Sequence, residues 1–528
     1  MPAGDDVYAS LQPRTRAAIT VNERSASISI TAVSGVQARV LDNFVGGRWV
    51  PATTGELFDV TNPATGELLA RVPLSGREDV EAAVAAARAA LPGWRAVSVI
   101  KRAQLLFALR EAMTVRAEEL AASVTREMGK TIGDARAEVE RAIEMVEAAT
   151  AVPQTMQGRN LEGVATNVDC ETIRQPVGVC AAITPFNFPA MVPFWFLPFA
   201  IATGNTFILK PSEQDPITQT IVFEILEALE LPPGVANLVN GAHDVVNAIL
   251  DSPGIDAVSF VGSAKVARHV YERAAAHGKR VQALGGAKNH MVVMPDAVIG
   301  KTAENIIASA FGAAGQRCMA GSVLVAVGGA WKALRPELIA RTTALTVGDP
   351  SVERVDVGPL ISPAACSRIE GEIQAALDAG ASLALDGRSP DGARDGGGYL
   401  GPTILENVAP DSDAVREEIF GPVLCVLEAD TLGEAIGLVN ASRYGNGSSI
   451  FTESGAAARR YRSEVQAGMI GVNIGVAAPV AFFPFSGWKG SFFGDIHAHG
   501  QDAVDFYTRK KTITSRWFSE PAGRFFVE

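Results

Sequence analysis

The sequence has few cysteines and no cysteine pair of the kind that binds metals. Its 528 residues include five cysteines, an odd number, and no C-x-x-C pair. Reduced thiols in a cytoplasmic protein explain this pattern better than disulfides or a zinc site. His497 and His499 form the closest histidine pair, but without nearby cysteines their spacing favours a solvated loop. We therefore expect a cytoplasmic protein without a metal, and assign these two histidines no role.

An excess of positive charge is also missing. The formal net charge is -12 at pH 7. Affinity for nucleic acids rests mainly on clustered Lys and Arg side chains, which neutralise the phosphate backbone. A nucleic-acid partner is therefore excluded, whereas a local basic pocket for a small anionic substrate remains compatible with this charge.

No hydrophobic run has the composition of a membrane span or a secretory signal. The longest uncharged stretch, residues 186–209, contains several prolines together with Asn and Thr. A buried helix between two buried strands explains this stretch better than a membrane span does. Residues 1–40 lack an apolar core, and acidic residues interrupt any basic amphipathic pattern, so we expect a mobile extension. No membrane partner is expected.

Two stretches of the chain alternate short apolar runs with helical segments. Over residues 177–261 the pattern is that of a βαβαβ unit, which predicts a parallel sheet with helices on both faces. Ligands of such sheets bind at the carboxyl ends of the strands. A second alternating region runs from about residue 291 to residue 440. The length and the average globular composition predict a large α/β enzyme of about two to four domains.

The standard dinucleotide fingerprint is absent from the first alternating region. No G-x-G-x-x-G follows its first strand, so that motif does not indicate a nicotinamide cofactor. Gly262 and Ser263 directly follow a predicted strand and open a helix, whose free amides can meet a pyrophosphate. Taken alone, a glycine before a helix is more often a simple turn.

Cys318 is a candidate nucleophile. It follows the apolar helix predicted over residues 302–314 and lies next to Arg317, and a nearby cation favours the thiolate over the thiol. The alternative is a buried structural cysteine, which is the more common role of an internal cysteine.

Seven short motifs decide between these alternatives. They are TPFNFP, ILKPSE, FVGSA, LGGAKNH, GQRC, EEIFGPVL and FPFSGWKGS, in this order along the chain. In their order and spacing, residues 41–518 resemble the aldehyde dehydrogenase superfamily. The segments GAKNH, GQRCMA and GWKGSFFGDIHAHGQDAVDFYTRKK are most similar to its CoA-acylating branch, the methylmalonate-semialdehyde (malonate-semialdehyde) dehydrogenases.

The resemblance implies a catalytic pair. Cys318 stands where the family has its nucleophile, and Asn187 stands where it has the amide that holds the oxyanion. Attack on an aldehyde creates an alkoxide, and one oriented donor contributes about 2.7–4 kcal/mol to its stabilisation in a comparable site. Outside this motif, Asn187 would be read as a turn residue that bonds its own backbone.

The resemblance also implies an NAD site. Lys210 and Glu213 match the residues that contact the adenosine ribose, and a carboxylate there repels a 2′-phosphate, so NAD is expected over NADP. Glu418 and Phe420 match the residues around the nicotinamide ribose and ring. The complete set of expected cofactor-binding residues is Thr184, Phe186, Lys210, Glu213, Gln214, Gly262, Ser263, Gly285, Glu418 and Phe420.

One departure from the family points to coenzyme A. Hydrolytic members have a glutamate before LGG as the general base for the deacylating water, whereas this chain has Ala283 in QALGGAKNH. Loss of a positioned base typically slows a reaction by about 10²–10⁴-fold. Water attack on the thioester should therefore be slow, and the thiolate of coenzyme A is the expected acyl acceptor.

Two arginines are candidates for recognising a substrate carboxylate. Arg317 lies beside Cys318, and Arg141 matches the second arginine of the semialdehyde branch by its place in the predicted helix over residues 138–149. Guanidinium offers paired donors that fit a carboxylate. The alternative for Arg317 is a role in tuning the thiol or capping the helix, and for Arg141 a surface salt bridge.

The resemblance implies two Rossmann-like α/β domains plus a small β element for oligomerisation. The NAD-binding domain is expected over residues 41–156 and 175–285, and the catalytic domain over 286–495. The bridging element is expected over 157–174 and 496–528. An unpaired strand FYTRKKTIT would leave an exposed edge, so we expect at least a dimer, and a homotetramer built as a dimer of dimers.

The predicted reaction is NAD-dependent oxidation of malonate or methylmalonate semialdehyde, with decarboxylation, to acetyl-CoA or propionyl-CoA. Two alternatives stay open. A hydrolytic semialdehyde dehydrogenase would release a free acid without coenzyme A. A catalytically silent binding protein with the same fold would have lost Cys318 or Asn187, and both residues are present.

Overall fold

The computed structural model describes residues 39–393 and 397–518. Apart from its last two residues, the extension expected over residues 1–40 lies outside this range. No helix in the described parts of the chain is long and apolar enough to span a membrane.

The first α/β region is built on an eight-stranded sheet in the order β2-β1-β9-β8-β7-β10-β11-β21. Its five central strands are parallel and confirm the predicted βαβαβ pattern. They are β7 (Val179–Ile183), β8 (Thr206–Lys210), β9 (Ala236–Leu238), β10 (Ala257–Val261) and β11 (Arg280–Leu284). The antiparallel edges are β1 (Asn43–Val45), β2 (Arg48–Val50) and β21 (Phe492–Gly494). Since β7 lies between β8 and β10, the strand order reverses there, which is where such sheets bind ligands.

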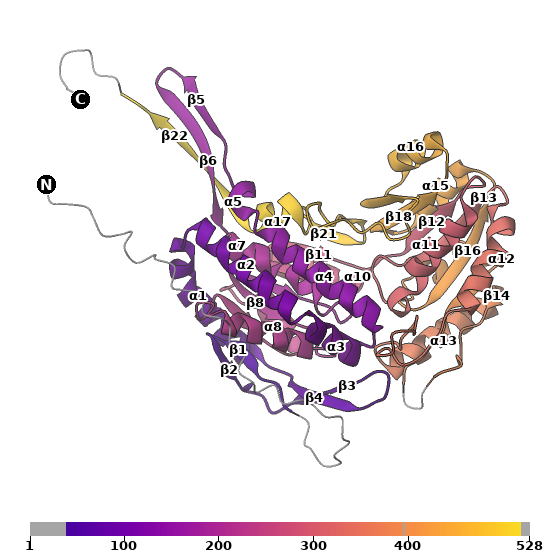
Figure 1. The fold of residues 1–528 in the computed structure, drawn as a ribbon. Coiled ribbons are helices and arrows are strands. Elements are labelled where there is room, and N and C mark those ends of the chain that lie inside the picture. Colours follow the sequence, from indigo (N-terminus) through magenta and orange to yellow (C-terminus); the bar gives the residue numbers. More distant parts are fainter. Residues whose placement is uncertain (1–38, 394–396, 519–528) are drawn as a thin grey trace. The chain divides into compact units, whose positions relative to one another are not determined.

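Apolar residues alternate along these strands and make two cores, one on each face. Val179 and Ala181 of β7 pack in one cluster, and Cys180 and Ala182 pack in the other. The first face is covered by α1 (Arg77–Ala96), α9 (His243–Asp251) and α10 (Ala264–Ala276). The opposite face is covered by α2 (Val99–Val115), α3 (Ala117–Met128), α4 (Ile132–Ala149), α6 (Met191–Phe194), α7 (Leu197–Ala202) and α8 (Ile217–Ala228). Figure 1 shows α2, α4 and α7 gathered over this opposite face.

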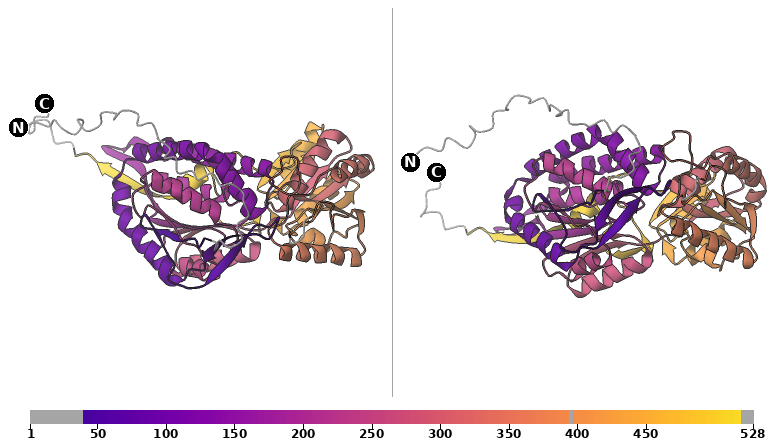
Figure 2. Two further views of the ribbon diagram at one scale, coloured as in Figure 1. Left: turned by 60° about the horizontal axis from the view of Figure 1, so that its bottom comes forward. Right: turned by 90° about the horizontal axis from the view of Figure 1, so that it is seen from below.

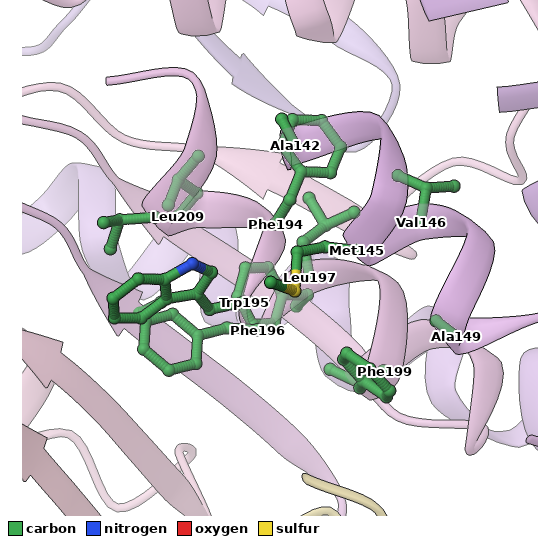
Figure 3. Packing of buried hydrophobic residues seen from close by; sticks show 14 of the residues in the cluster. Ala142, Met145, Val146, Ala149, Phe194, Trp195, Phe196, Leu197, Phe199 and Leu209 are labelled. Atoms are coloured by element: carbon green, nitrogen blue, oxygen red, sulfur yellow. The ribbon is translucent and has the colours of Figure 1, made fainter. Parts of the chain in front are cut away.

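The uncharged stretch over residues 186–209 is a buried helical connection, as predicted. It contains α6 and α7 between β7 and β8, and the side chains from Phe194 to Phe199 are almost completely buried. In Figure 3 Phe194 lies beside Ala142 and Leu197 lies beside Met145, and Ala142 and Met145 belong to α4. Helix α4 is thereby packed against the segment that follows β7.

The second α/β region has a seven-stranded sheet in the order β14-β15-β16-β13-β12-β18-β19. Its strands are β12 (Asn289–Val293), β13 (Gly321–Val327), β14 (Ser382–Leu385), β15 (Thr403–Glu406), β16 (Val423–Ala429), β18 (Gly447–Phe451) and β19 (Met469–Val472). Its helices are α11 (Ile299–Phe311), α12 (Ala330–Thr343), α13 (Pro363–Asp378), α14 (Asp413–Arg416), α15 (Leu432–Ala441) and α16 (Gly455–Glu464). In the views of Figure 2 these orange segments stand apart from the indigo and magenta segments, so each sheet carries its own helices.

Three short pairings complete the fold. A three-stranded sheet, β22-β6-β5, joins β5 (Asn160–Ala165), β6 (Val168–Pro176) and β22 (Thr508–Arg516), with Thr508 opposite Pro176. The strand FYTRKKTIT is therefore paired within its own chain, and its free side, like that of β5, is an edge of this sheet. The others are β3 (Leu57–Thr61) with β4 (Leu68–Pro73), and β17 (Tyr444–Gly445) with β20 (Trp488–Lys489). The short helices α5 (Val152–Thr155) and α17 (Gly500–Phe506) flank the three-stranded sheet in sequence.

Residues expected in the catalytic region return to the first sheet. Residues 492–494 form β21 and pair antiparallel with β11, so the second α/β region ends before residue 492. His499 is also not in a solvated loop, contrary to the sequence interpretation. Its side chain is 1% exposed and packs edge-on against Trp195, with ring centroids 4.7 Å apart. The reason is that α17 folds back onto the α7 side of the first sheet.

Candidate active site

A cavity of about 740 Å³ opens at the carboxyl ends of β7, β8 and β10 and reaches Cys318. All ten expected cofactor-binding residues line it, together with Asn187 and Cys318. The remaining lining residues include Lys265, His243, His269 and Arg368. Residues that the sequence places up to 236 positions apart, from Thr184 to Phe420, are thus gathered around one volume.

A strained turn brings Cys318 to this cavity. The turn η1 (Gly312–Gly315) follows α11, and in it Ala313, Ala314 and Gly315 all have left-handed φ values, of 50°, 52° and 69°. Such a conformation is costly for alanine and persists only when the surroundings impose it. At Gly315 a Cβ would lie 2.1 Å from the carbonyl oxygen of Gly421, so only glycine fits.

The backbone of Cys318 is held by two amide side chains. Asn289 Nδ2 and Asn446 Nδ2 donate hydrogen bonds of 2.8 and 3.0 Å to its carbonyl oxygen. Asn289 begins β12, and Asn446 lies just before β18 in the same sheet. The backbone of Cys318 is therefore fixed to two neighbouring strands of the second sheet, β12 and β18.

The thiol of Cys318 is not activated by its surroundings in this state. Burial raises its pKa to about 12, and the carboxylate of Glu418 adds to the rise, while Arg317 opposes it only slightly. The guanidinium of Arg317 is engaged by the carboxylate of Asp134, Nη2 to Oδ1 at 2.7 Å. Arg317 does lower the pKa of Cys318, as expected of a nearby cation, but the desolvation of the buried thiol outweighs this effect.

Asn187 lies in the loop after β7 with its side chain in the same cavity. Its Nδ2 donates a hydrogen bond of 3.0 Å to the carbonyl oxygen of Gln316, two residues before Cys318. An amide nitrogen carries two hydrogens, so this bond orients the amide and leaves one N–H available. The arrangement can hold an oxygen atom that becomes negatively charged beside Cys318.

The opposite end of the cavity has groups that suit a ribose and a pyrophosphate. Lys210, the last residue of β8, donates from Nζ to Glu213 Oε2 at 2.9 Å. Ser263 begins the thirteen-residue helix α10 without a side-chain cap, so the first amides of that helix are free to bind an anion. His243 and His269 also line this end and share Asn247 as a hydrogen-bond partner. Sequence reasoning missed these histidines because no motif contains them.

Glu418 and Phe420 close the cavity from the second region. Burial raises the pKa of Glu418 to about 7, and the amide N–H of Ala287 donates to its Oε1 at 3.1 Å. A Cβ at Gly286 would lie 2.6 Å from Glu418 Oε2, so a larger residue at this position would displace the Glu418 carboxylate. The ring of Phe420 lies edge-on to that of Phe186, with centroids 5.8 Å apart.

Ala283, at the place where hydrolytic members have the general base, lies in β11 next to its last residue, Leu284. Side chains alternate along a strand, and Ala283 packs in the cluster with α1, α9 and α10, whereas Leu284 packs in the cluster on the opposite face. Both side chains are apolar and buried, so no carboxylate stands at this place.

Neither candidate arginine lines the cavity. The Arg141 side chain is 47% exposed and pairs with Glu144, Nη1 to Oε2 at 2.7 Å, as in the alternative of a surface salt bridge. Arg317 is 19% exposed, and besides Asp134 its Nη1 donates to the carbonyl oxygen of Ala308 at 3.3 Å. Among the described residues, no group of three or more His, Cys, Asp or Glu side chains could hold a metal ion.

Comparison with known proteins extends these observations. The sequence profile of the aldehyde dehydrogenase family matches residues 49–513, which include every residue that lines the cavity. The chain is similar to malonate-semialdehyde dehydrogenase 2 of Geobacillus kaustophilus, with 49% identity over 484 residues. This match covers 92% of the chain and 100% of that protein.

Solved structures show the same likeness. A protein of Sinorhizobium meliloti 1021, assigned as a methylmalonate-semialdehyde dehydrogenase and crystallised with NAD, matches with a TM-score of 0.90 and 43% identity. The match covers 92% of this chain and 99% of that one. Methylmalonate-semialdehyde dehydrogenase of Oceanimonas doudoroffii also has a TM-score of 0.90, with 42% identity over 91% of this chain and 99% of that one.

Proposed function

This chain belongs to the aldehyde dehydrogenase family, and from that membership we propose that it oxidises malonate or methylmalonate semialdehyde and transfers the acyl group to coenzyme A. The relatives named above carry these substrates in their names, and one was crystallised with NAD. The observation that carries the proposal is the single cavity that joins Lys210 and Glu213 to Cys318 and Asn187.

The cavity fits NAD by the chemistry of its donors. Glu213 can accept hydrogen bonds from both ribose hydroxyls, and its charge opposes the 2′-phosphate of NADP. The free amides at the start of α10 suit the pyrophosphate, and the carboxylate of Glu418, which lines the same cavity, can accept a hydrogen bond from the second ribose. When bound there, NAD supplies the acceptor for the hydride of the aldehyde.

Cys318 and Asn187 divide the chemistry between them. The sulfur of Cys318 attacks the carbonyl carbon, and the free N–H of Asn187 together with the backbone N–H of Cys318 stabilises the alkoxide. Loss of hydride leaves a thioester on Cys318. Because the thiol begins protonated, its proton must leave before or during attack.

The thioester is expected to wait for coenzyme A. Ala283 offers no group that could deprotonate a water molecule, so hydrolysis lacks its base. The thiolate of coenzyme A attacks the same carbonyl carbon and releases Cys318. With β-decarboxylation of the acyl chain, the products are acetyl-CoA from malonate semialdehyde and propionyl-CoA from methylmalonate semialdehyde.

Arg317 and Arg141 remain candidates for the substrate carboxylate. Only two of the N–H groups of Arg317 are taken, by Asp134 and Ala308, so part of its donor fork is open. For Arg141 to bind substrate, its guanidinium would have to exchange Glu144 for the incoming carboxylate and turn inward.

We also propose a homotetramer in the cytoplasm. The sheet β22-β6-β5 has two unpaired edges, every residue of β5 is exposed, and Leu161 on it is 63% exposed. Strand edges of this kind pair readily with another copy. All five cysteines are free, which fits a reducing compartment.

Product analysis with and without coenzyme A tests the proposed reaction. We expect steady NADH formation only with coenzyme A, and a burst of NADH followed by a slow rate without it, because acylation proceeds while hydrolysis lags. Mass spectrometry should find acetyl-CoA or propionyl-CoA. Fast turnover without coenzyme A, with a free acid as product, would falsify the acyl-transfer reaction.

A further inference from the structure

A buried ion pair lies directly under the loop that carries Asn187. Lys130 and Glu138 bond to each other, and their side chains are 1% and 0% exposed. Lys130 Nζ also donates to the backbone carbonyl oxygen of Asn187 at 2.9 Å and lies 3.7 Å from the centroid of the Phe188 ring. Burying two charges is costly unless further hydrogen bonds satisfy them. Here those further bonds all go to one loop.

Glu138 holds the other end of the same loop. Its Oε1 accepts from the backbone N–H groups of Ala190 and Met191, at 2.8 and 3.1 Å. Between these contacts, Gln219 Nε2 donates to the carbonyl oxygen of Pro189 at 2.6 Å. The backbone around Asn187 is therefore fixed by charged or buried partners on both sides.

Asp134 makes the corresponding contacts with the loop that carries Cys318. Its Oδ2 accepts from the backbone N–H of Ala313 at 3.0 Å, and its Oδ1 accepts from Arg317 Nη2 at 2.7 Å. Ala313 is one of the strained residues of η1, and Arg317 immediately precedes the nucleophile. A carboxylate that bonds to both ends of this segment helps to impose the strained conformation.

Both carboxylates belong to one face of α4. Asp134 and Glu138 are four residues apart, which places them on the same face with about 6 Å of helix rise between them. The loops they hold come from different sheets, since Asn187 follows β7 and Cys318 precedes β13. One helical turn of α4 thus contacts both of the loops that carry the proposed catalytic pair.

We propose that Lys130, Asp134 and Glu138 form a positioning brace that sets the amide of Asn187 against the sulfur of Cys318. This inference rests on the roles of Cys318 and Asn187 in the proposed function. None of the three residues lines the cavity, so they act through the loops they hold. Apolar residues could fill the same space without burying charge, whereas they could not fix backbone carbonyl and amide groups in direction.

The contacts of Lys130 and Glu138 with the Asn187 loop are tested with the double variant Lys130→Met/Glu138→Gln. This variant removes both charges together and keeps an acceptor for the backbone N–H groups of Ala190 and Met191. We expect the rate constant of the NADH burst to fall by about tenfold to hundredfold, because a misplaced oxyanion donor costs that much. Binding of NAD should be unchanged. Arg136→Gln is the matched control, since Arg136 lies on the same helix but pairs at the surface with Glu118 and Glu353.

A double-mutant cycle with Asn187→Ala separates positioning from general loosening. If Lys130 and Glu138 act through Asn187, their double variant should lower the burst rate constant little further once Asn187 is alanine. An equal loss in both backgrounds would overturn the brace. Asn187→Ala alone should already slow the burst, and an unchanged rate there would overturn the oxyanion assignment of the proposed function, and the brace with it.

The contacts of Asp134 with the Cys318 loop are tested with Asp134→Asn. This variant also tests the brace if the double variant does not fold. We expect the rate of alkylation of Cys318 by iodoacetamide and the burst rate each to change by about tenfold, because the loop is released from its carboxylate. Lys130→Met/Glu138→Gln should leave the alkylation rate unchanged. Wild-type burst and alkylation rates in Asp134→Asn would overturn the positioning role of Asp134.

Discussion

The two ends of the cavity are built in different ways. At the ribose end, Lys210 and Glu213 are three residues apart and bond to each other, so a single short segment supplies the recognition. At the end proposed to hold the nucleophile, the segment over residues 316–318 bonds to Asp134, Asn187 and Asn446, which come from three other parts of the chain. We infer that cofactor binding here depends on residues close together in the sequence, whereas the geometry around Cys318 depends on residues far apart in the sequence. Changes at the two ends should therefore differ in kind as well as in size.

The largest effect is expected from Cys318→Ala. It should lower NADH formation by at least about 1,000-fold, since removal of a nucleophile leaves only binding and the oxyanion donors. NAD affinity should stay within error, because the ribose end does not depend on Cys318. Stopped-flow absorbance at the NADH band and a fluorescence titration with NAD measure the two quantities. Substantial residual turnover would mean that another group attacks the aldehyde.

Ala283→Glu should have the next largest effect. A carboxylate at this position would supply the missing base and raise turnover without coenzyme A by about 10- to 100-fold. Leu284→Glu is the matched control, because it places the same group on the opposite face of β11, in an apolar cluster, and should only destabilise the fold. A rise in Leu284→Glu but not in Ala283→Glu would show that the missing base belongs on the other face of β11.

The contrast between these two residues shows where sequence reasoning stops. The motifs predicted residues that the structure gathers around one cavity, because each motif fixes its own local backbone. A motif does not state on which face a strand residue points, and only the structure shows that Ala283 and Leu284 pack on opposite faces of β11. His499 was misplaced because only the packing of α17 shows that it is buried.

The fold could be predicted from the sequence more readily than the residues that position the catalytic loops. Apolar runs alternating with helices predicted the parallel sheet, and the prolines within residues 186–209 correctly argued for buried helices. Lys130, Asp134 and Glu138 carry no such signal, because charged residues on a helix usually face solvent. Their role becomes visible only when the backbone groups of residues 187–191 and 313 are found beside them.

Arg141→Leu tests whether the nucleophile end also selects the substrate. Hydrogen bonds to charged groups contribute about 1.5–3 kcal/mol, so kcat/KM for malonate semialdehyde should fall about tenfold or more if Arg141 binds its carboxylate. The value for propanal should barely change. Steady-state kinetics with both aldehydes measures this. Since Arg141 pairs with Glu144 at the surface, equal and small losses on both substrates would assign it to structure alone.

The pH dependence of thiol alkylation tests the electrostatics of the nucleophile end. The pKa of Cys318 is raised to about 12, mainly by burial, so the thiol is protonated at neutral pH and the thiolate fraction grows as pH rises. Without cofactor, the alkylation rate should therefore increase about tenfold per pH unit from pH 7 to 10 without levelling off. Cys318→Ala corrects for the other cysteines. A plateau below pH 9 would show that the thiol is activated before NAD binds.

The smallest effect is expected at the ribose end, from Glu213→Gln. The neutral amide can still accept a hydrogen bond from a ribose hydroxyl, but it no longer repels a 2′-phosphate. We expect the preference for NAD over NADP, measured as the ratio of kcat/KM values, to shrink by about tenfold, which corresponds to about 1.4 kcal/mol. The burst rate constant at saturating NAD should stay unchanged, because Glu213 does not touch the nucleophile's loops.

In Glu213→Gln, a changed preference for NAD over NADP together with an unchanged burst rate constant would show that the two ends of the cavity act independently. Lys210 becomes free when Glu213 loses its charge, and a free ammonium group favours the added phosphate, so both changes act in the same direction. A preference that does not move would mean that another group recognises the ribose, and His243 and His269, which also line the cavity, are candidates. A slower burst would instead show that the local end is coupled to the chemistry after all.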